Sequence, residues 1–401
     1  MSTKTLTFTR TIKTTPAAAY YAFTNGTALQ QWVCDGLCVT PRANGPYLLT
    51  WRSNYYAVWS FDELQENEKI VVTWHGKDDP GKTRITVTFA EQGENTSITL
   101  EHSNIGTGDE WQNAVPELEK GWNSGLENLQ SVLETGVDLR FVRQPLLGIF
   151  SGGVINAAKA EELGIPAVTG MLISGTAEGT GAEAIGLEKN DVISKIDNVA
   201  IVTGGELRDI LSSKNAGDEV EVVFYRKGHE FTVRMHLSGR QAPELPASPA
   251  EFASQMQAGY DSADTDLEDL LQGVTEEEAS RKPAPGEWSV KDVMAHLIWT
   301  ERYFQFYLWS MIGGNGNVSF PDNNDAQLVA ILTTCPTLPQ LIAESKASER
   351  AVTAIFAALP EEFQKRKGSY MQVMLYFMNC GLHQRSHFEQ IQNAVDDARE
   401  S

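Results

Sequence analysis

The segment PGEWSVKDVMAH, residues 285–296, carries the pattern that decides the fold of the C-terminal third of the chain. Ser289 is followed three residues later by Asp292, which is the spacing of a capping box at a helix start. Trp288 and Val293 stand where a hydrophobic staple fixes the entry of the chain into a helix. The segment therefore predicts a helix that starts at the capping serine and carries a histidine after its second turn.

A second histidine-bearing segment, YFMNCGLHQRSHF, covers residues 376–388. His383 and His387 are spaced i, i+4, which puts both imidazoles on one face of a helix. If the helix that carries His296 packs beside this one, three neutral imidazoles converge and leave coordination positions open. Imidazole ligands suit zinc, nickel or iron, and the sequence does not select among them. The three histidines therefore predict a divalent-metal site.

Two glutamates lie close to these histidines in the sequence. Glu301 follows His296 by five residues, and Glu389 follows His387 by two. Neither spacing returns to the face of the helix that carries the histidine. The sequence therefore assigns no catalytic residue to this site.

The composition limits the kinds of partner. The chain has 401 residues, which predicts two or three domains. Its 53 acidic against 32 basic residues give a net charge of −21, which disfavours nucleic acid and anionic membranes. No signal-like apolar core and no run of about 18 apolar residues is present. With four cysteines, the chain fits a reducing compartment, so we expect a cytoplasmic protein without a membrane partner.

The first part of the chain, residues 1–138, predicts an antiparallel sheet closed by one long helix. Alternating apolar residues predict a first strand, and Thr15 caps a helix with Pro16 at its first position. The long amphipathic helix near the end of this part contains Pro116, which should begin or kink it. Strands are expected at residues 6–12, 47–51, 57–64, 70–74, 84–90 and 97–102.

This part resembles the START-like (SRPBCC) superfamily, and most closely its Aha-type, chaperone-activator-like branch. The resemblance rests on residues 8–12, 22–25, 31–32 and 121–134. It implies a helix-grip fold with a pocket for a small apolar ligand, or a surface for a chaperone. Aromatic walls suit an apolar ligand, although a plain core explains the same residues equally well. The expected ligand-cavity residues are Trp32, Trp51, Trp59 and Trp74.

The second part, residues 141–240, contains short strands and a short helix. Thr203 and Glu206 form a capping box, and Arg226 to His229 form a hairpin turn. The segment GLEKNDVI, residues 186–193, and the loop LGI, residues 147–149, resemble a PDZ domain of the bacterial, protease-associated type.

The PDZ resemblance implies a small β-rich domain that captures the C-terminus of a peptide as an added strand. The alternative is a groove that only packs on a neighbouring domain. Asn190 stands where the family has a glycine, and asparagine tolerates a positive φ. The expected peptide-binding residues are Leu147, Gly148 and Ile149 in the carboxylate loop, and Leu207, Ile210 and Leu211 in the side-chain pocket.

Residues 241–249 form a linker by composition, and residues 250–399 predict an all-α four-helix bundle. The last helix is expected as one segment from about 369 to 396. Residues 285–297, with His383-x-x-x-His387 and Ile391, resemble the DinB-like (DinB/YfiT) metalloproteins. The resemblance implies that the three histidines are the metal ligands. Its characterised members include metal-dependent transferases of low-molecular-weight thiols.

The sequence as a whole thus predicts a multidomain α+β protein with a metal site in its last domain. Three functions follow from it: a metal-dependent thiol transferase, a metal-dependent hydrolase, or a non-catalytic adaptor that keeps a vestigial ion. Whether the bundle forms a homodimer is left open by the resemblance.

Overall fold

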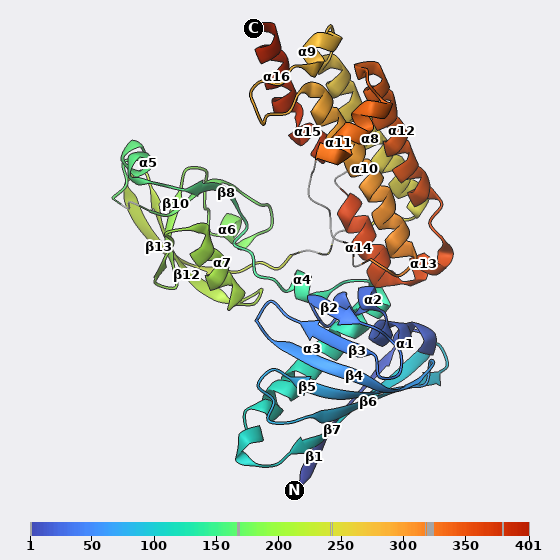
Figure 1. The fold of residues 1–401 in the computed structure, drawn as a ribbon. Coiled ribbons are helices and arrows are strands. Elements are labelled where there is room, and N and C mark those ends of the chain that lie inside the picture. Colours follow the sequence, from blue (N-terminus) through green and yellow to red (C-terminus); the bar gives the residue numbers. More distant parts are fainter. Residues whose placement is uncertain are drawn as a thin grey trace. The chain divides into compact units, whose positions relative to one another are not determined.

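The computed structural model describes residues 2–166, 169–240, 242, 244–316, 318, 325–378 and 381–400 (Figure 1). It confirms the predicted multidomain fold of two sheets and a helical C-terminal part. The chain divides into two compact units, one made of Met1–Val137 with Pro243–Ser401 and the other of Asp138–Ala242. Of the predicted linker, Gln241 and Pro243 lie outside the described residues.

The N-terminal sheet has seven antiparallel strands in the order β1-β7-β6-β5-β4-β3-β2. The sequence did not predict β2, because this four-residue strand has no alternating pattern. The strands are β1 (Thr3–Ile12), β2 (Gly36–Val39), β3 (Pro46–Thr50), β4 (Tyr56–Gln65), β5 (Lys69–Gly76), β6 (Thr83–Gln92) and β7 (Asn95–Gly106). The helical elements are α1 (Pro16–Thr24), α2 (Gly26–Gln30), the 3-10 turn η1 (Asp109–Trp111) and α3 (Ala114–Thr135).

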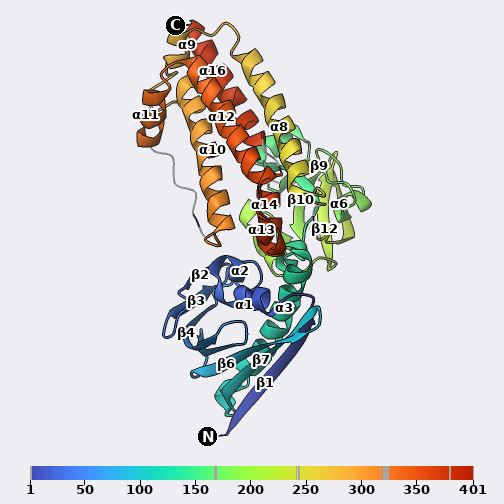
Figure 2. The same cartoon turned by 90° about the vertical axis from the view of Figure 1, so that its right-hand side faces the viewer.

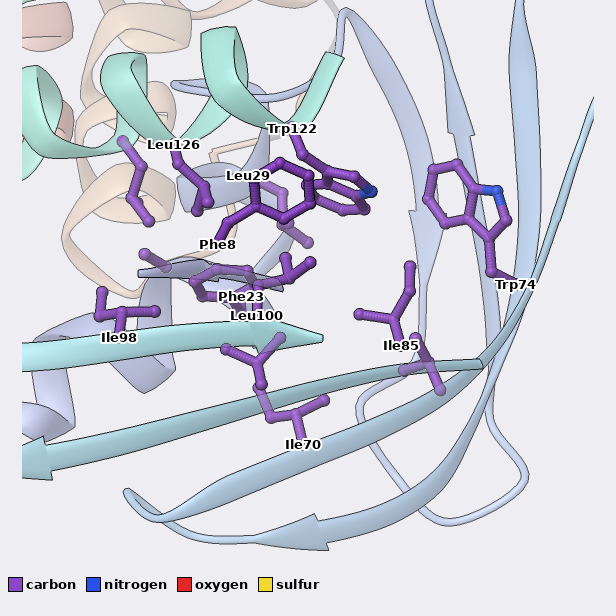
Figure 3. Packing of buried hydrophobic residues seen from close by; sticks show 14 of the residues in the cluster. Phe8, Phe23, Leu29, Ile70, Trp74, Ile85, Ile98, Leu100, Trp122 and Leu126 are labelled. Carbon is purple, nitrogen blue, oxygen red and sulfur yellow. The ribbon is translucent and has the colours of Figure 1, made fainter. Parts of the chain in front are cut away.

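Helix α3 covers one face of this sheet. Pro116 is its third residue, and a proline in the first turn removes no helical hydrogen bond, as expected. Figure 3 shows Trp122 and Leu126 pointing from α3 toward Leu100 and the sheet. All three side chains are buried, and burying a residue of this size stabilises the fold by about 1.5–3 kcal/mol. The sheet and the helix therefore share one apolar core.

His102 of β7 is fully buried in this core. The indole N–H of Trp122 donates to His102 Nδ1 at 3.1 Å, so the ring proton lies on Nε2, which is 2.6 Å from Thr83 Oγ1. Burial lowers the pKa of His102 from 6.5 to about 4. The imidazole is therefore neutral in the folded protein at pH 7.

Acidification is expected to destabilise this domain through His102. Below pH 6.5 His102 becomes protonated in the unfolded chain, whereas in the folded chain it stays neutral until about pH 4. The free energy of unfolding therefore falls as the pH drops through this window. The full loss is about 3 kcal/mol, from about 1.4 kcal/mol for each unit of pKa shift. Denaturant unfolding followed by tryptophan fluorescence between pH 7 and 4 measures it. A His102→Gln variant should lose this contribution while that of His383 remains, and a slope equal to that of the parent protein would contradict the assignment.

The second unit contains a small sheet in the order β13-β12-β10-β9-β8, with β11 paired to β10. Asn190 adopts a φ of 74°, which this amide side chain tolerates as expected. Lys227 and Gly228, with φ of 49° and 82°, form the two-residue hairpin turn between β12 and β13. Its elements are α4 (Leu139–Val142), β8 (Ile149–Val154), α5 (Ala157–Glu162), β9 (Met171–Thr176), α6 (Gly181–Ala184), β10 (Val192–Ile196), β11 (Val199–Ala200), α7 (Gly204–Ser212), β12 (Glu219–Arg226) and β13 (His229–His236).

The C-terminal part is a helical bundle in which α8, α10 and α12 run side by side (Figures 1 and 2). Ser289 and Asp292 form the expected capping box at the start of α10. The helices are α8 (Pro249–Leu270), α9 (Glu276–Ser280), α10 (Val290–Ile312), α11 (Asp325–Thr334), α12 (Leu338–Ala357), α13 (Glu361–Lys365), α14 (Lys367–Phe377), α15 (Leu382–Ser386) and α16 (Phe388–Glu400).

The prediction of one continuous last helix is wrong. The segment consists of α14, α15 and α16, and Gly381 precedes α15 with a φ of 83°, which an α-helix does not allow.

Among the described helices, none alone has the length and hydropathy of a membrane span. Helices α11 and α12 meet the criterion only as a pair, across a bend of 107°.

Candidate functional site

The structure brings His296, His383 and His387 together. His296 is buried on α10, His383 lies in α15, and His387 directly follows α15 as its C-cap residue. His383 Nε2 lies 3.3 Å from His296 Nε2 and 3.3 Å from His387 Nε2. The three ligand nitrogens all lie within 4.8 Å of one another. Nε2 of His383 therefore faces two other imidazole nitrogens. A single proton on it can form a hydrogen bond to only one of them, so the other contact lacks a proton donor.

The protonation of the cluster suits a metal ligand set. His387 Nδ1 lies 2.9 Å from the amide oxygen of Gln390, which only accepts, so Nδ1 carries the proton and Nε2 keeps its lone pair. Burial, and then the neighbouring charges of His387 and His296, lower the pKa of His383 to about 4. Neutral imidazoles are the form in which histidine binds metal.

The spacing also fits a common ion. Two nitrogens at the usual zinc–nitrogen length of about 2.0–2.1 Å and a tetrahedral angle lie about 3.3 Å apart. Both distances from His383 Nε2 match this value. An imidazole-only set is compatible with several divalent metals. The donor set therefore fits a divalent ion with open coordination positions.

A cavity of about 130 Å³ lies beside His383. Its volume is enough for several water molecules or a small organic group. Tyr376, which is half exposed, forms part of its wall, so this side of the wall lies at the protein surface. The lining residues are Tyr260, Leu297, Glu301, Phe304, Glu349, Tyr376, Phe377, Gly381, His383 and Gln384.

Two buried carboxyl groups, Glu301 and Glu349, line this cavity, and a third, Asp264, accepts a hydrogen bond from the lining residue Gln384. Glu301 on α10, Glu349 on α12 and Asp264 on α8 are each less than a tenth exposed. Burial, followed by the charge of Glu349, raises the pKa of Glu301 to about 8. Burial and the charge of Asp264 raise the pKa of Glu349 as well. The two buried glutamates therefore hold their protons at neutral pH unless a cation lies beside them.

The sequence placed Glu301 on a different helix face from His296 and assigned it no role, and the structure places it in the wall of the cavity that His383 also lines. Spacing along α10 relates Glu301 only to His296, whereas the cavity joins it to His383 from another helix. A usable signal was present in the sequence. Glu301 stands between Leu297 and Phe304 in an apolar stripe, where a charged residue is unusual.

The tryptophans predicted to line a ligand cavity lie mostly in the N-terminal core. Trp32, Trp59 and Trp74 are buried in one cluster, and Trp51 packs against it half buried. The indole N–H of Trp32 donates to a backbone carbonyl, whereas the buried Trp59 Nε1 has no partner among the described residues. The prediction that these residues hold a ligand stays a prediction.

Five of the six predicted peptide-binding residues of the second unit belong to its apolar core or pack against it. Gly148 has a φ of 81°, and a side chain there would collide with Thr180. Its neighbour Ile149 begins β8, the strand that ends the sheet order. Leu147 and Ile210 are buried in the core cluster, and Ile149, Leu207 and Leu211 pack on it partly exposed. Peptide binding by these residues stays a prediction.

Three family models match separate parts of the chain. Residues 13–134 match Activator of Hsp90 ATPase homolog 1-like protein, residues 153–237 match the PDZ domain, and residues 260–391 match the DinB superfamily. The chain thus combines an Aha-type START-like domain, a PDZ domain and a DinB-type domain, as the sequence predicted.

Curated relatives are bacterial proteases. A probable periplasmic serine protease do/HhoA-like of Haemophilus influenzae is 30% identical over 31% of this chain and 25% of its own. A probable periplasmic serine endoprotease DegP-like of a Marinomonas species is 31% identical over 26% of this chain and 21% of its own. The chain therefore spans about a quarter of the length of these relatives.

Solved structures resemble a third of the chain. An Hsp90 activator from Plasmodium falciparum is 23% identical, with a TM-score of 0.29, over 32% of this chain and 95% of that one. The Aha1 dimer from Colwellia psychrerythraea is 18% identical, with a TM-score of 0.30, over 33% of this chain and 96% of that one.

Proposed function

We propose that the DinB-type domain binds a divalent metal ion through His296, His383 and His387 and transfers a low-molecular-weight thiol to an electrophile. The observation that carries this proposal is the convergence of three imidazole nitrogens, one of them from His383, which also lines a cavity. His383 belongs to both the nitrogen cluster and the cavity wall, so a molecule in the cavity lies next to the ligand set.

The protein residues hold the reaction partners and keep them dry. A divalent ion supplies, when bound, a lower thiol pKa, so that thiolate is available at neutral pH. Gln390 keeps the proton of His387 on Nδ1, which holds Nε2 ready as a ligand. The rings of Phe304, Tyr376 and Phe377 reduce the access of water to the cavity.

The transfer itself is a substitution. The thiol loses its proton to solvent, the sulfur forms a bond to the electrophilic carbon, and the leaving group departs with its bonding electron pair. Thiol consumption therefore equals product formation, and no oxidant or reductant is required.

This proposal is tested by turnover with and without thiol. Zinc-loaded protein is given glutathione or cysteine with chlorodinitrobenzene, and thiol loss and chloride release are measured together. We expect equal amounts of both, above the uncatalysed rate, and no catalysis after removal of metal. Product formation that is indifferent to thiol would support a metal-dependent hydrolase instead.

A second candidate is a cytoplasmic adaptor without catalysis. The position of β8 at the end of the sheet order favours it, because an edge strand can accept a peptide as a further strand. The PDZ domain would then hold a protein C-terminus, and the START-like domain a small apolar ligand or a chaperone. Bound metal with no turnover across the thiol and water assays would select the adaptor over the transferase.

A further inference from the structure

The cavity beside His383 contains hydrogen-bond acceptors that lack donors. Gln384 is 5% exposed and Glu349 3% exposed, and both line the cavity. Among the described residues, no donor reaches Gln384 Oε1 or Glu349 Oε2. A buried acceptor without a donor costs about 1–3 kcal/mol, so these two oxygens point to a missing hydrogen-bond donor.

The other polar atoms of these side chains are already engaged. Gln384 Nε2 donates to Asp264 Oδ1 at 3.0 Å, and Ser345 Oγ donates to Glu349 Oε1 at 3.1 Å. Tyr260 donates its hydroxyl to Glu301 Oε2 at 2.9 Å. The nearby ammonium of Lys346 is paired with Glu268 at 2.7 Å. Among the described residues, these contacts leave Gln384 Oε1 and Glu349 Oε2 without a donor, and a ligand that enters the cavity would supply one.

The walls specify the charge of that ligand. Phe304, Tyr376 and Phe377 contribute aromatic rings, whose faces attract a cation that has left water. Glu301 and Glu349 contribute carboxyl oxygens that accept hydrogen bonds. An alkylammonium group has several N–H donors, a positive charge and an apolar stem, and it matches all three features.

We infer that this cavity binds the protonated amine of a substrate, with Glu349, Glu301 and Gln384 as acceptors, beside the metal site. The inference that the transferase acts on substrates that carry an amine rests on the proposed function. Binding of an amine in the cavity can be measured in protein without metal.

The probe is n-butylammonium, compared with n-butanol as the neutral analogue of similar length. Calorimetric titration of metal-free full-length protein at pH 7 should show saturable binding of the amine and at least about ten-fold weaker binding of the alcohol. Equal binding of both, or binding of neither, would overturn the inference. Turnover of thiol plays no part in this measurement, so its failure leaves the proposed transferase activity to be judged separately.

Glu349→Gln tests the residue assignment without changing side-chain size. We expect the affinity for n-butylammonium to fall at least about ten-fold, because an amide cannot ionise to pair with the bound ammonium as the Glu349 carboxyl can. Glu344→Gln, on the same helix but in an exposed pair with Arg302, is the control and should change affinity less than about two-fold. Glu301→Gln is the second variant should the first not fold. Unchanged amine affinity in a folded cavity variant would refute the assignment.

Discussion

Replacing His387 by alanine is expected to weaken binding of zinc by roughly 100-fold or more. The substitution removes one of three convergent nitrogens, and even loss of a group that only orients a ligand costs about 10–100-fold. Competition with a chromophoric chelator measures the affinity, and elemental analysis of the purified protein measures the content. Because metal binds the folded state, saturating zinc should also raise the melting temperature of the parent protein and not that of the variant.

Two further variants, one with a smaller expected loss of zinc affinity and one control, accompany His387→Ala. Gln390→Ala removes the acceptor of the His387 Nδ1 proton and should weaken zinc binding by about ten-fold, less than loss of the ligand. His75→Ala removes an exposed imidazole of β5 and should change nothing. Equal zinc affinity in the parent and the His387→Ala variant would remove the basis of the metal site.

Arg226→Ala is expected to destabilise the PDZ domain by about 3–5 kcal/mol, which is the usual cost of leaving a buried charge unpaired. Asp191 is 1% exposed, and Arg226 donates to its two oxygens at 2.7 and 2.6 Å. The backbone N–H of Glu188 also donates to Asp191, at 2.8 Å. The aspartate is thus held in the dry loop before β10 largely by the guanidinium.

Hydrogen exchange measures this effect within the whole chain. None of the nine tryptophans lies in residues 138–242, so tryptophan fluorescence does not report on this domain. Exchange of the amides of β10 and β12 gives the free energy of opening directly. Arg234→Ala breaks an exposed pair with Glu219 on the same hairpin and should cost at most about 1 kcal/mol. Similar exchange in both variants would show that the buried pair contributes little.

Local patterns in the sequence predicted much of this protein correctly. The capping box at Ser289, the start of the long helix at Pro116 and the hairpin turn before His229 each depend on residues fewer than five positions apart. Such features depend on hydrogen bonds and dihedral angles within one turn. The break at Gly381 was missed because a glycine inside an apolar helical pattern is often tolerated.

The sequence by itself determined the three domain types, the elements inside them and the identity of the histidines available for a metal. Only the tertiary structure decided that His383 shares a cavity with Glu301 and Glu349, since these residues come from three different helices. Helical periodicity fixes which side chains share one helix face. It does not fix how neighbouring helices are rotated and shifted against each other, because that depends on the packing of whole side-chain surfaces.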